Sequence, residues 1–89
     1  MNTIDITDDN LHTFYSKISQ NIIKIRKSKK ISQLDLATSI GHTSATFFGK
    51  AELLAENKHF NLEHLYKIAI ALNVDIKDFF EGIETIKEN

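Results

Sequence analysis

Four histidines are the side chains best suited to bind a metal ion or to move a proton, and they are scattered along the 89-residue chain. A helical zinc site pairs histidines about one turn apart and adds a carboxylate. His12, His42, His59 and His64 do not follow this spacing. We therefore expect no metal ion. We interpret His42 as a turn residue, with contact of its protonated ring to a phosphate as the alternative.

Covalent catalysis has no support in the sequence either. Serine, histidine and aspartate all occur, but neither a nucleophile elbow nor a glycine-rich phosphate loop accompanies them. The chain contains no cysteine, which excludes disulfides and thiolate metal sites. A domain of this length also has little room for a deep cleft. We expect a protein that is not an enzyme and that carries no cofactor.

The densest group of like charges is a basic run of Lys24, Arg26, Lys27, Lys29 and Lys30. One interpretation places the run beside phosphates, and the other is a solvated helix end whose cations complement the helix dipole. The formal net charge of the chain is −1. That balance counts against a nucleic-acid binder, because phosphate contacts dominate DNA affinity, although the distribution of charge over the surface matters more.

The elements that position these side chains are predicted to be helices. The chain has no proline and three glycines, and it shows no β-hairpin turn signal or long apolar–polar alternation. Its hydrophobic content of 42% is enough for a core. A domain this small buries a modest fraction of its surface, so a dimer contact would add stability by mass action.

The first predicted helix covers residues 10–29. Thr7, Asp8 and Asp9 precede it and suit a helix start, because their oxygens accept hydrogen bonds from free N–H groups and their charges complement the dipole. Its apolar residues recur in steps of three and four and mark one face: Leu11, Phe14, Ile18, Ile22 and Ile25.

A second, short helix is expected between Ser32 and Gly41. Ser32 is the predicted N-cap, Asp35 completes a variant of the capping box, and Gly41 ends the helix in a left-handed conformation. Thr43 or Ser44 is predicted to cap the helix that follows. The apolar residues expected on these two helices are Leu36, Ala37, Ile40, Phe47, Phe48, Ala51 and Leu54.

Two further helices are predicted beyond a polar loop. Asn61 caps the first of them, with Asn73 as its left-handed C-cap residue, and Asp75 caps the second, which Gly82 ends. Their apolar residues are Leu62, Leu65, Ile68, Ala69, Leu72, Ile76, Phe79 and Phe80. The prediction is an all-α, compact five-helix domain over 10–82, between a flexible N-terminal tail (1–9) and a C-terminal tail (83–89).

Two blocks of residues resemble the helix-turn-helix domains of the Cro and lambda-repressor type, also called the xenobiotic-response-element family. The first block contains Ile25-Arg26, Ser32-Gln33, Leu36-Ala37 and Gly41, and the second spans 62–74. Their order and separation fit the family, and the resemblance covers 22–80. It implies a lambda-repressor-like fold in which the helix after Gly41, the recognition helix, enters the major groove of DNA.

The resemblance also implies roles for individual residues. Gln33 matches the glutamine that opens the second helix and touches the DNA backbone, where a helix N-terminus attracts phosphate. Thr43 and Lys50 are the other expected backbone contacts. The whole DNA-binding set that the resemblance implies is Gln33, Thr43, Ser44, Ala45, Thr46, Gly49 and Lys50.

The chain departs from the family pattern at one ion pair. Arg26 matches a family arginine that pairs with a glutamate at the end of the recognition helix. Counted from Gly41, the glutamate position holds Ala51, and Glu52 follows one residue late. The loop before Leu62 is also longer than usual, which indicates an insertion in or after the recognition helix. We expect Glu52 to pair with Arg26, two unrelated surface charges being the alternative.

The side chains offered to the groove are small. The hydroxyls of Ser44 and Thr46 discriminate poorly between bases, whereas strong base reading uses Arg, Lys, Asn or Gln. We therefore expect specificity to come from DNA shape, water and dimer spacing. Phe47 matches a core position of the family, which turns Phe48 partly outward unless the insertion rotates it inward.

These observations predict a sequence-specific regulator of transcription, a repressor, that binds double-stranded DNA as a homodimer. Phe80 and Ile83 are the expected dimer contact. The alternative is a protein-interaction module, such as an antitoxin or a phage-associated adaptor, that keeps the fold and reads little or no DNA; its partner would be a toxin or another regulator. The N-terminus lacks the features of a signal peptide and no apolar run reaches about 18 residues, so we expect a cytoplasmic protein without a membrane segment.

Overall fold

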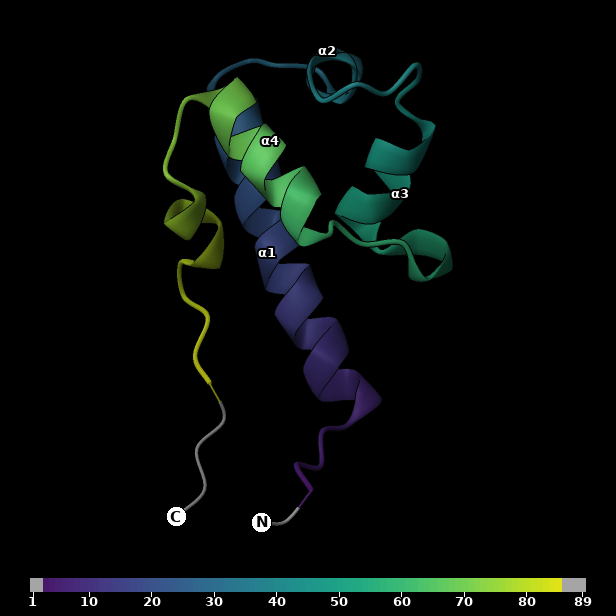
Figure 1. The fold of residues 1–89 in the computed structure, drawn as a ribbon, viewed down its shortest axis with the longest axis vertical. Helices are drawn as coiled ribbons and strands as arrows, with labels where there is room; N and C mark the ends of the chain where they lie inside the picture. Colours follow the sequence, from purple (N-terminus) through teal and green to yellow (C-terminus); the bar gives the residue numbers. More distant parts are fainter. Residues whose placement is uncertain (1–2, 86–89) are drawn as a thin grey trace.

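The chain folds into four α-helices with two single 3₁₀ turns among the residues that the computed structural model describes, 3–85 (Figure 1). They are α1 (Asp8–Ser28), α2 (Gln33–Ser39), α3 (Thr46–Leu53), η1 (Ala55–Asn57), α4 (Leu62–Leu72) and η2 (Ile76–Phe80). This part of the chain contains no β-strand. The predicted all-α class is confirmed, but the expected fifth helix is a 3₁₀ turn and η1 was not expected.

Helix α1 begins two residues earlier than predicted, because Thr7 and Asn10 cap it reciprocally. The Thr7 hydroxyl accepts a hydrogen bond from the Asn10 N–H at 3.0 Å, and the Asn10 side chain accepts one from the Thr7 N–H at 3.2 Å. Asp8 therefore belongs to the helix and not to the expected tail 1–9, of which residues 1 and 2 lie outside the described residues. The N-terminal part of α1 projects beyond the other helices (Figure 1).

Three helices end in the same C-terminal motif, with one residue in the left-handed conformation. These residues are Lys30 (φ 59°), Gly41 (φ 95°) and Asn73 (φ 57°). In each case the next N–H reaches back to a carbonyl of the last turn, at 3.1, 3.0 and 3.0 Å respectively. The predictions for Gly41 and Asn73 are confirmed, whereas the role of Lys30 was not predicted.

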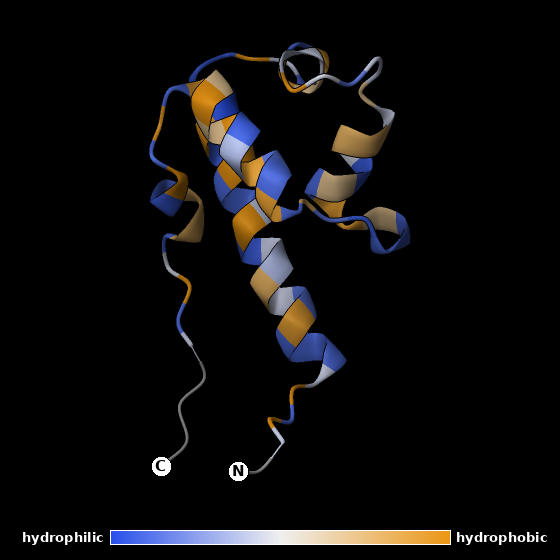
Figure 2. Cartoon of the chain, viewed as in Figure 1, coloured by the Kyte–Doolittle hydropathy of each residue, from blue (hydrophilic) through white to orange (hydrophobic). Residues whose placement is uncertain are grey.

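The core is built from one face of each element. Helix α1 packs against α3 and η2, while α4 packs against α2 and η2, and hydrophobic residues recur along α1 and α4 with hydrophilic ones between them (Figure 2). Leu62 was expected on the buried side of α4 but is 76% exposed. The buried apolar side chains are Ile18, Ile22, Leu36, Ala37, Ile40, Phe48, Ala51, Phe60, Leu65, Ile68, Ala69, Leu72 and Phe79.

The start of α3 differs from the prediction. Neither Thr43 nor Ser44 caps it: the N-cap position is Ala45, which makes no side-chain capping bond, and the Ser44 hydroxyl accepts only a long 3.4 Å bond from the Thr46 N–H. The turn after α2 is therefore longer than expected. Phe48 fills the core position that was expected for Phe47.

Phe48 and Glu52 show the same change of register along α3. Phe48 is fully buried and Phe47 half-buried, so the one-residue shift is already present at Phe48. Glu52 lies one helical turn beyond Phe48 and is buried on the same side of α3. The structure thus changes the register expected for α3, while the insertion in or after the recognition helix stays a prediction. The longer loop before Leu62 contains η1.

The C-terminal part of the domain is tied to α1 by side chains. Asn61 caps α4 as predicted, in a reciprocal capping box with His64. Asp75 occupies the N-cap position of η2 without a side-chain bond. Asn21 of α1 donates hydrogen bonds to the carbonyls of Phe79 and Glu81, at 2.9 and 3.0 Å.

No helix within residues 3–85 combines the length and the apolar character that a membrane crossing requires. The expected C-terminal tail 83–89 is described only to residue 85, and its residues 86–89 lie outside the described part. Ile83, the first residue of this tail, packs against the core.

Candidate functional site

A buried polar network fixes the helix that was predicted to recognise DNA. The Arg26 guanidinium donates to both carboxylate oxygens of Glu52, at 2.7 and 3.0 Å, and Gln33 donates to the same carboxylate at 2.8 Å. Arg26 also donates to the Ile31 carbonyl at 2.8 Å. Arg26 and Glu52 are 7% and 5% exposed. The network joins α1, α2 and α3, and its two-pronged geometry restricts how α3 can turn.

Gly49 lies at the contact between α3 and α2. A Cβ atom at this position would lie 3.4 Å from the side-chain oxygen of Gln33. Gly49 therefore lets the two helices approach each other at the Gln33 side chain, and it is half-buried. The structure brings together Gln33 and Gly49 of the predicted DNA-binding set, but as parts of the support of α3.

The exposed residues of the predicted set gather at the start of α3. Thr43, Ser44 and Thr46 are exposed, and Ala45 between them is half-buried. Hydroxyl groups that are exposed at the end of a helix can donate to and accept from phosphates or base edges. The remaining residue of the set, Lys50, lies one turn beyond Thr46.

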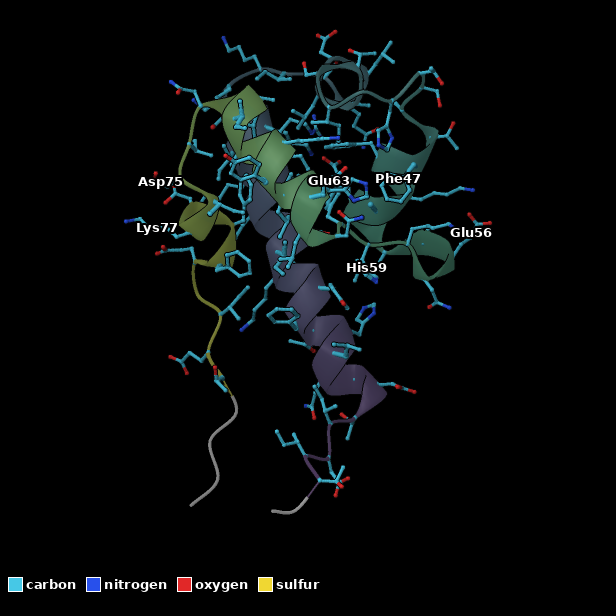
Figure 3. All side chains as sticks on the ribbon, viewed as in Figure 1. Phe47, Glu56, His59, Glu63, Asp75 and Lys77 are labelled. Atoms are coloured by element: carbon cyan, nitrogen blue, oxygen red, sulfur yellow. The ribbon has the colours of Figure 1, made fainter. Side chains whose placement is uncertain are left out.

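The charge of Lys50 is already paired in the free protein. Its ammonium group contacts the carboxylate of Glu56 in η1, on the outer side of the α3–η1 corner (Figure 3). The hydrogen bond and charge of Lys50 lower the pKa of the Glu56 carboxyl below its ordinary value of 4.5. An exposed ion pair contributes little net free energy, so Lys50 can exchange Glu56 for another anion at small cost.

Sequence reasoning missed an exposed leucine on the same helix. Leu53 is 77% exposed at the end of α3, and Leu34 of α2 is 49% exposed. The signal was available in the spacing, because Leu53 follows Thr46 by two helical turns and so lies on the same outer face. The outer side of the recognition helix is thus less polar than its predicted contact set indicated.

A cluster of aromatic rings packs against the turn between α2 and α3. The Phe47 ring, labelled in Figure 3, lies 5.3 Å from the His42 ring and 4.9 Å from the His64 ring, between centroids. The two imidazoles are 5.7 Å apart. Burial lowers the pKa of His64 below its ordinary value of 6.5, and the neighbouring His42 lowers that pKa further. His42 therefore packs at the base of the turn.

Other predicted residues lie elsewhere. The lysines of the basic run, Lys24, Lys27, Lys29 and Lys30, are exposed at the end of α1 and in the connection to α2. Phe80 and Ile83, the expected dimer contact, are half-buried and pack against the core of their own chain. Within residues 3–85 no three histidine, aspartate or glutamate side chains are placed so that they could hold a metal ion together.

A hollow of about 570 Å³ lies between the start of α1 and the η1 segment, and Leu54 at the end of α3 is part of its lining. Its wall contains the Tyr15 ring stacked on the His59 ring, with 3.9 Å between the centroids. Asp8, Asp9 and Lys58 line its rim. The hollow is open to solvent, and the stacked rings of Tyr15 and His59 join α1 to the segment after η1.

Comparison with known proteins gives one match. Residues 21–84 match the family model described as the Cro/C1-type HTH DNA-binding domain. No curated protein and no solved structure matches the chain. The matched region begins inside α1, so the projecting part of that helix lies outside it.

Proposed function

Because the chain belongs to the Cro/C1-type helix-turn-helix DNA-binding domain family, we propose that it is a transcriptional repressor that binds double-stranded DNA as a dimer through α3. The observation that carries the proposal is the Arg26–Glu52–Gln33 network. It holds α3 rigidly while the hydroxyls of Thr43, Ser44 and Thr46 remain exposed at its start. Repression requires only that the bound protein block other proteins from the same DNA.

The proposed contacts divide into two groups. Thr43 and Lys50 contact the phosphates, and Gln33 lies behind them. Contacts to phosphates set the position of the protein on the duplex but carry no sequence information. Ser44, Ala45 and Thr46 meet base edges in the major groove, where their hydroxyl and methyl groups discriminate weakly. Two copies would read half-sites about 34 Å apart, and that spacing would add specificity.

A selection from a randomised duplex pool tests this function, with a pair of matched variants. Thr46→Glu puts a negative charge at the start of α3, and Thr13→Glu adds the same charge at an exposed position on α1. We expect a palindromic sequence to be enriched by the wild-type protein and bound by Thr13→Glu with nearly wild-type affinity. Thr46→Glu should weaken that binding by about tenfold or more, because its carboxylate would face the DNA.

The same two variants also define the result that would overturn the proposal. If no sequence is enriched, or if Thr46→Glu and Thr13→Glu bind equally well, α3 does not enter the groove. Thr46→Glu leaves the helix start intact, because an acidic residue in the first turn complements the helix dipole. Its effect therefore reports on the interface and not on folding.

A second function, a protein-interaction module, is favoured by the apolar character of the outer face. Leu53 and Leu34 are exposed on α3 and α2, and the nearest cation, Lys50, is paired with Glu56. Phe48 and Leu54 add little to this exposed apolar surface, since Phe48 is fully buried and Leu54 is half-buried. A failed DNA selection together with protein binding that Leu53→Glu abolishes would favour the module.

A further inference from the structure

Helix α4 carries an exposed apolar stripe beside its buried side. Leu62, Tyr66 and Ile70 recur every four residues and are 76%, 64% and 65% exposed. The neighbouring side of the helix holds the buried residues Leu65, Ile68, Ala69 and Leu72. Soluble monomers rarely expose large apolar side chains in a row, and such a row marks a binding surface. We call these three residues the α4 stripe.

We propose that the α4 stripe binds the α4 stripe of a second copy of this chain, with the two helices antiparallel. The inference deepens the dimer of the proposed function and rests on it for its biological role. The spacing of the stripe supports a self-complementary contact. Leu62 and Ile70 lie four residues before and after Tyr66, so a two-fold axis beside Tyr66 places Leu62 of each copy next to Ile70 of the other.

The geometry of helix packing fits the same arrangement. A row of residues at intervals of four is the ridge that fits into the equivalent groove of another helix, at a crossing angle of about −50°. The side chains of the stripe form one such ridge, which the second copy would also present. With the two-fold axis beside Tyr66, the two ridges lie next to each other, and the ridge of each copy fills the groove of the other.

The charges beside the stripe are also self-complementary. Glu63 and Lys67 border it and form an ion pair at 3.0 Å within the helix; Glu63 is labelled in Figure 3. The Lys67 ammonium lowers the pKa of the Glu63 carboxyl. In the antiparallel pair, Glu63 of one copy lies within a helical turn of Lys67 of the other. The ion pairs can therefore form between copies without leaving a charge unpaired.

The residues that were first expected to make the dimer contact already pack within their own chain. Phe80 and Ile83 pack against their own core, which leaves α4 as the helix with an apolar outer face near the C-terminal half of the domain. A standard interface buries about 800 Å² on each partner, which is more than three side chains supply. We therefore expect a weak, reversible dimer that becomes fully populated when DNA holds two copies side by side.

Sedimentation equilibrium of the purified protein without DNA tests this contact. We expect a monomer–dimer equilibrium in about the micromolar to submillimolar range. Ile70→Glu should raise its dissociation constant about tenfold or more, because the carboxylate would be buried against Leu62 of the second copy. Ile6→Glu is the matched control, since Ile6 is 58% exposed and lies outside the helices; it should leave the dissociation constant unchanged.

A mixture of two variants tests the antiparallel register. Leu62→Lys and Ile70→Glu should each dimerise poorly alone and should associate when mixed, because one of the two symmetric contacts then pairs opposite charges. A wild-type protein that stays monomeric at about 1 mM, or a dimer that Ile70→Glu leaves unchanged, would overturn the proposal and assign the stripe to a different protein. Thr46→Glu should dimerise normally, which separates this result from a failure of DNA binding.

Discussion

Among individual residues, Glu52 has the central place in the buried polar network. It accepts hydrogen bonds from Arg26 of α1 and Gln33 of α2, so three helices meet at one pair of oxygen atoms. Among the described residues, no buried side-chain nitrogen or oxygen lacks a hydrogen-bond partner. A fully satisfied network of this kind gives a helix one defined orientation, which an exposed DNA-binding surface requires.

Removing Arg26 should strongly destabilise the fold. Arg26→Ala leaves the Glu52 carboxylate buried without a countercharge, and we expect the free energy of unfolding to fall by about 3–5 kcal/mol. Urea denaturation measures this change. Replacing both partners, as in the double variant Arg26→Met with Glu52→Leu, should cost much less. A loss below about 1 kcal/mol for Arg26→Ala would show that the pair behaves as a surface pair.

His64 should make the stability of the domain depend on pH. The pKa of His64 in the folded protein is lowered by burial and by His42, and its Nδ1 accepts a 3.0 Å hydrogen bond from the Asn61 N–H. The unfolded chain therefore takes up a proton at a higher pH than the folded one. The stability that the neutral His64 ring contributes to the fold is therefore fully present above pH 6.5, and it is lost as the pH falls below that value.

The matched variant is His64→Gln, because glutamine supplies the capping acceptor without titrating. Urea denaturation between about pH 7.5 and 5 should show a smaller loss of stability for His64→Gln than for the wild-type protein. His42 and His59 lie near the ring and Glu63 and Lys67 flank it along α4. Both proteins contain these four groups, so the difference between the two slopes belongs to His64. Equal slopes for both proteins would contradict the assignment.

At the scale of elements, the ends of the helices decide how α1, α2 and α3 are arranged. The three left-handed C-terminal motifs fix the direction in which the chain leaves α1, α2 and α4. Two of them use Gly41 and Asn73, which adopt this conformation readily. The third uses Lys30, for which the conformation costs about 1–2 kcal/mol relative to glycine.

Lys30→Gly should therefore stabilise the protein. The substitution removes the strain at φ 59°, and we expect a gain of about 1 kcal/mol in the free energy of unfolding, partly offset by the entropy of glycine in the unfolded chain. Lys30→Ala is the control for the lost lysine side chain and should not gain stability, since alanine carries the same Cβ. A stability of Lys30→Gly at or below that of Lys30→Ala would refute the strain.

The elements show what the sequence could predict and why. Thr7, Ser32 and Asn61 were recognisable helix caps, because their side chains accept the free N–H groups of a first turn. Lys30 and Leu54 were not recognisable as left-handed residues, since packing around them, and not their own preference, imposes the conformation. The sequence also gave no sign of η1.

The predicted register of α3 was wrong, and the predicted cap of this helix depended on it. Phe47 and Phe48 are adjacent, and local pattern alone does not decide which of two phenylalanines enters the core. The packing of Phe48 and the pairing of Glu52 with Arg26 decide it together. The cap of α3 moved with the register, from Thr43 or Ser44 to Ala45.

For the whole molecule, the distribution of charge limits how DNA can be bound. Lys50 is the cation on α3, and its exposed pair with Glu56 must open for it to reach a phosphate. Lys50→Ala should weaken binding to all duplexes and reduce the slope of log K against log salt by about 1. Lys77, on the other side of the domain in Figure 3, is the control: a Lys77→Ala slope reduced equally would show that Lys50 has no special contact.

The central claim is that this domain binds double-stranded DNA, and a salt titration of wild-type binding to a random-sequence duplex tests it most directly. We predict a dissociation constant in about the micromolar range at low salt, and a log K that falls linearly with log salt, by about 0.9 for each phosphate neutralised. Absence of binding at low salt, or binding that does not respond to salt, would contradict the account and favour a protein partner that contacts the exposed leucines Leu34 and Leu53.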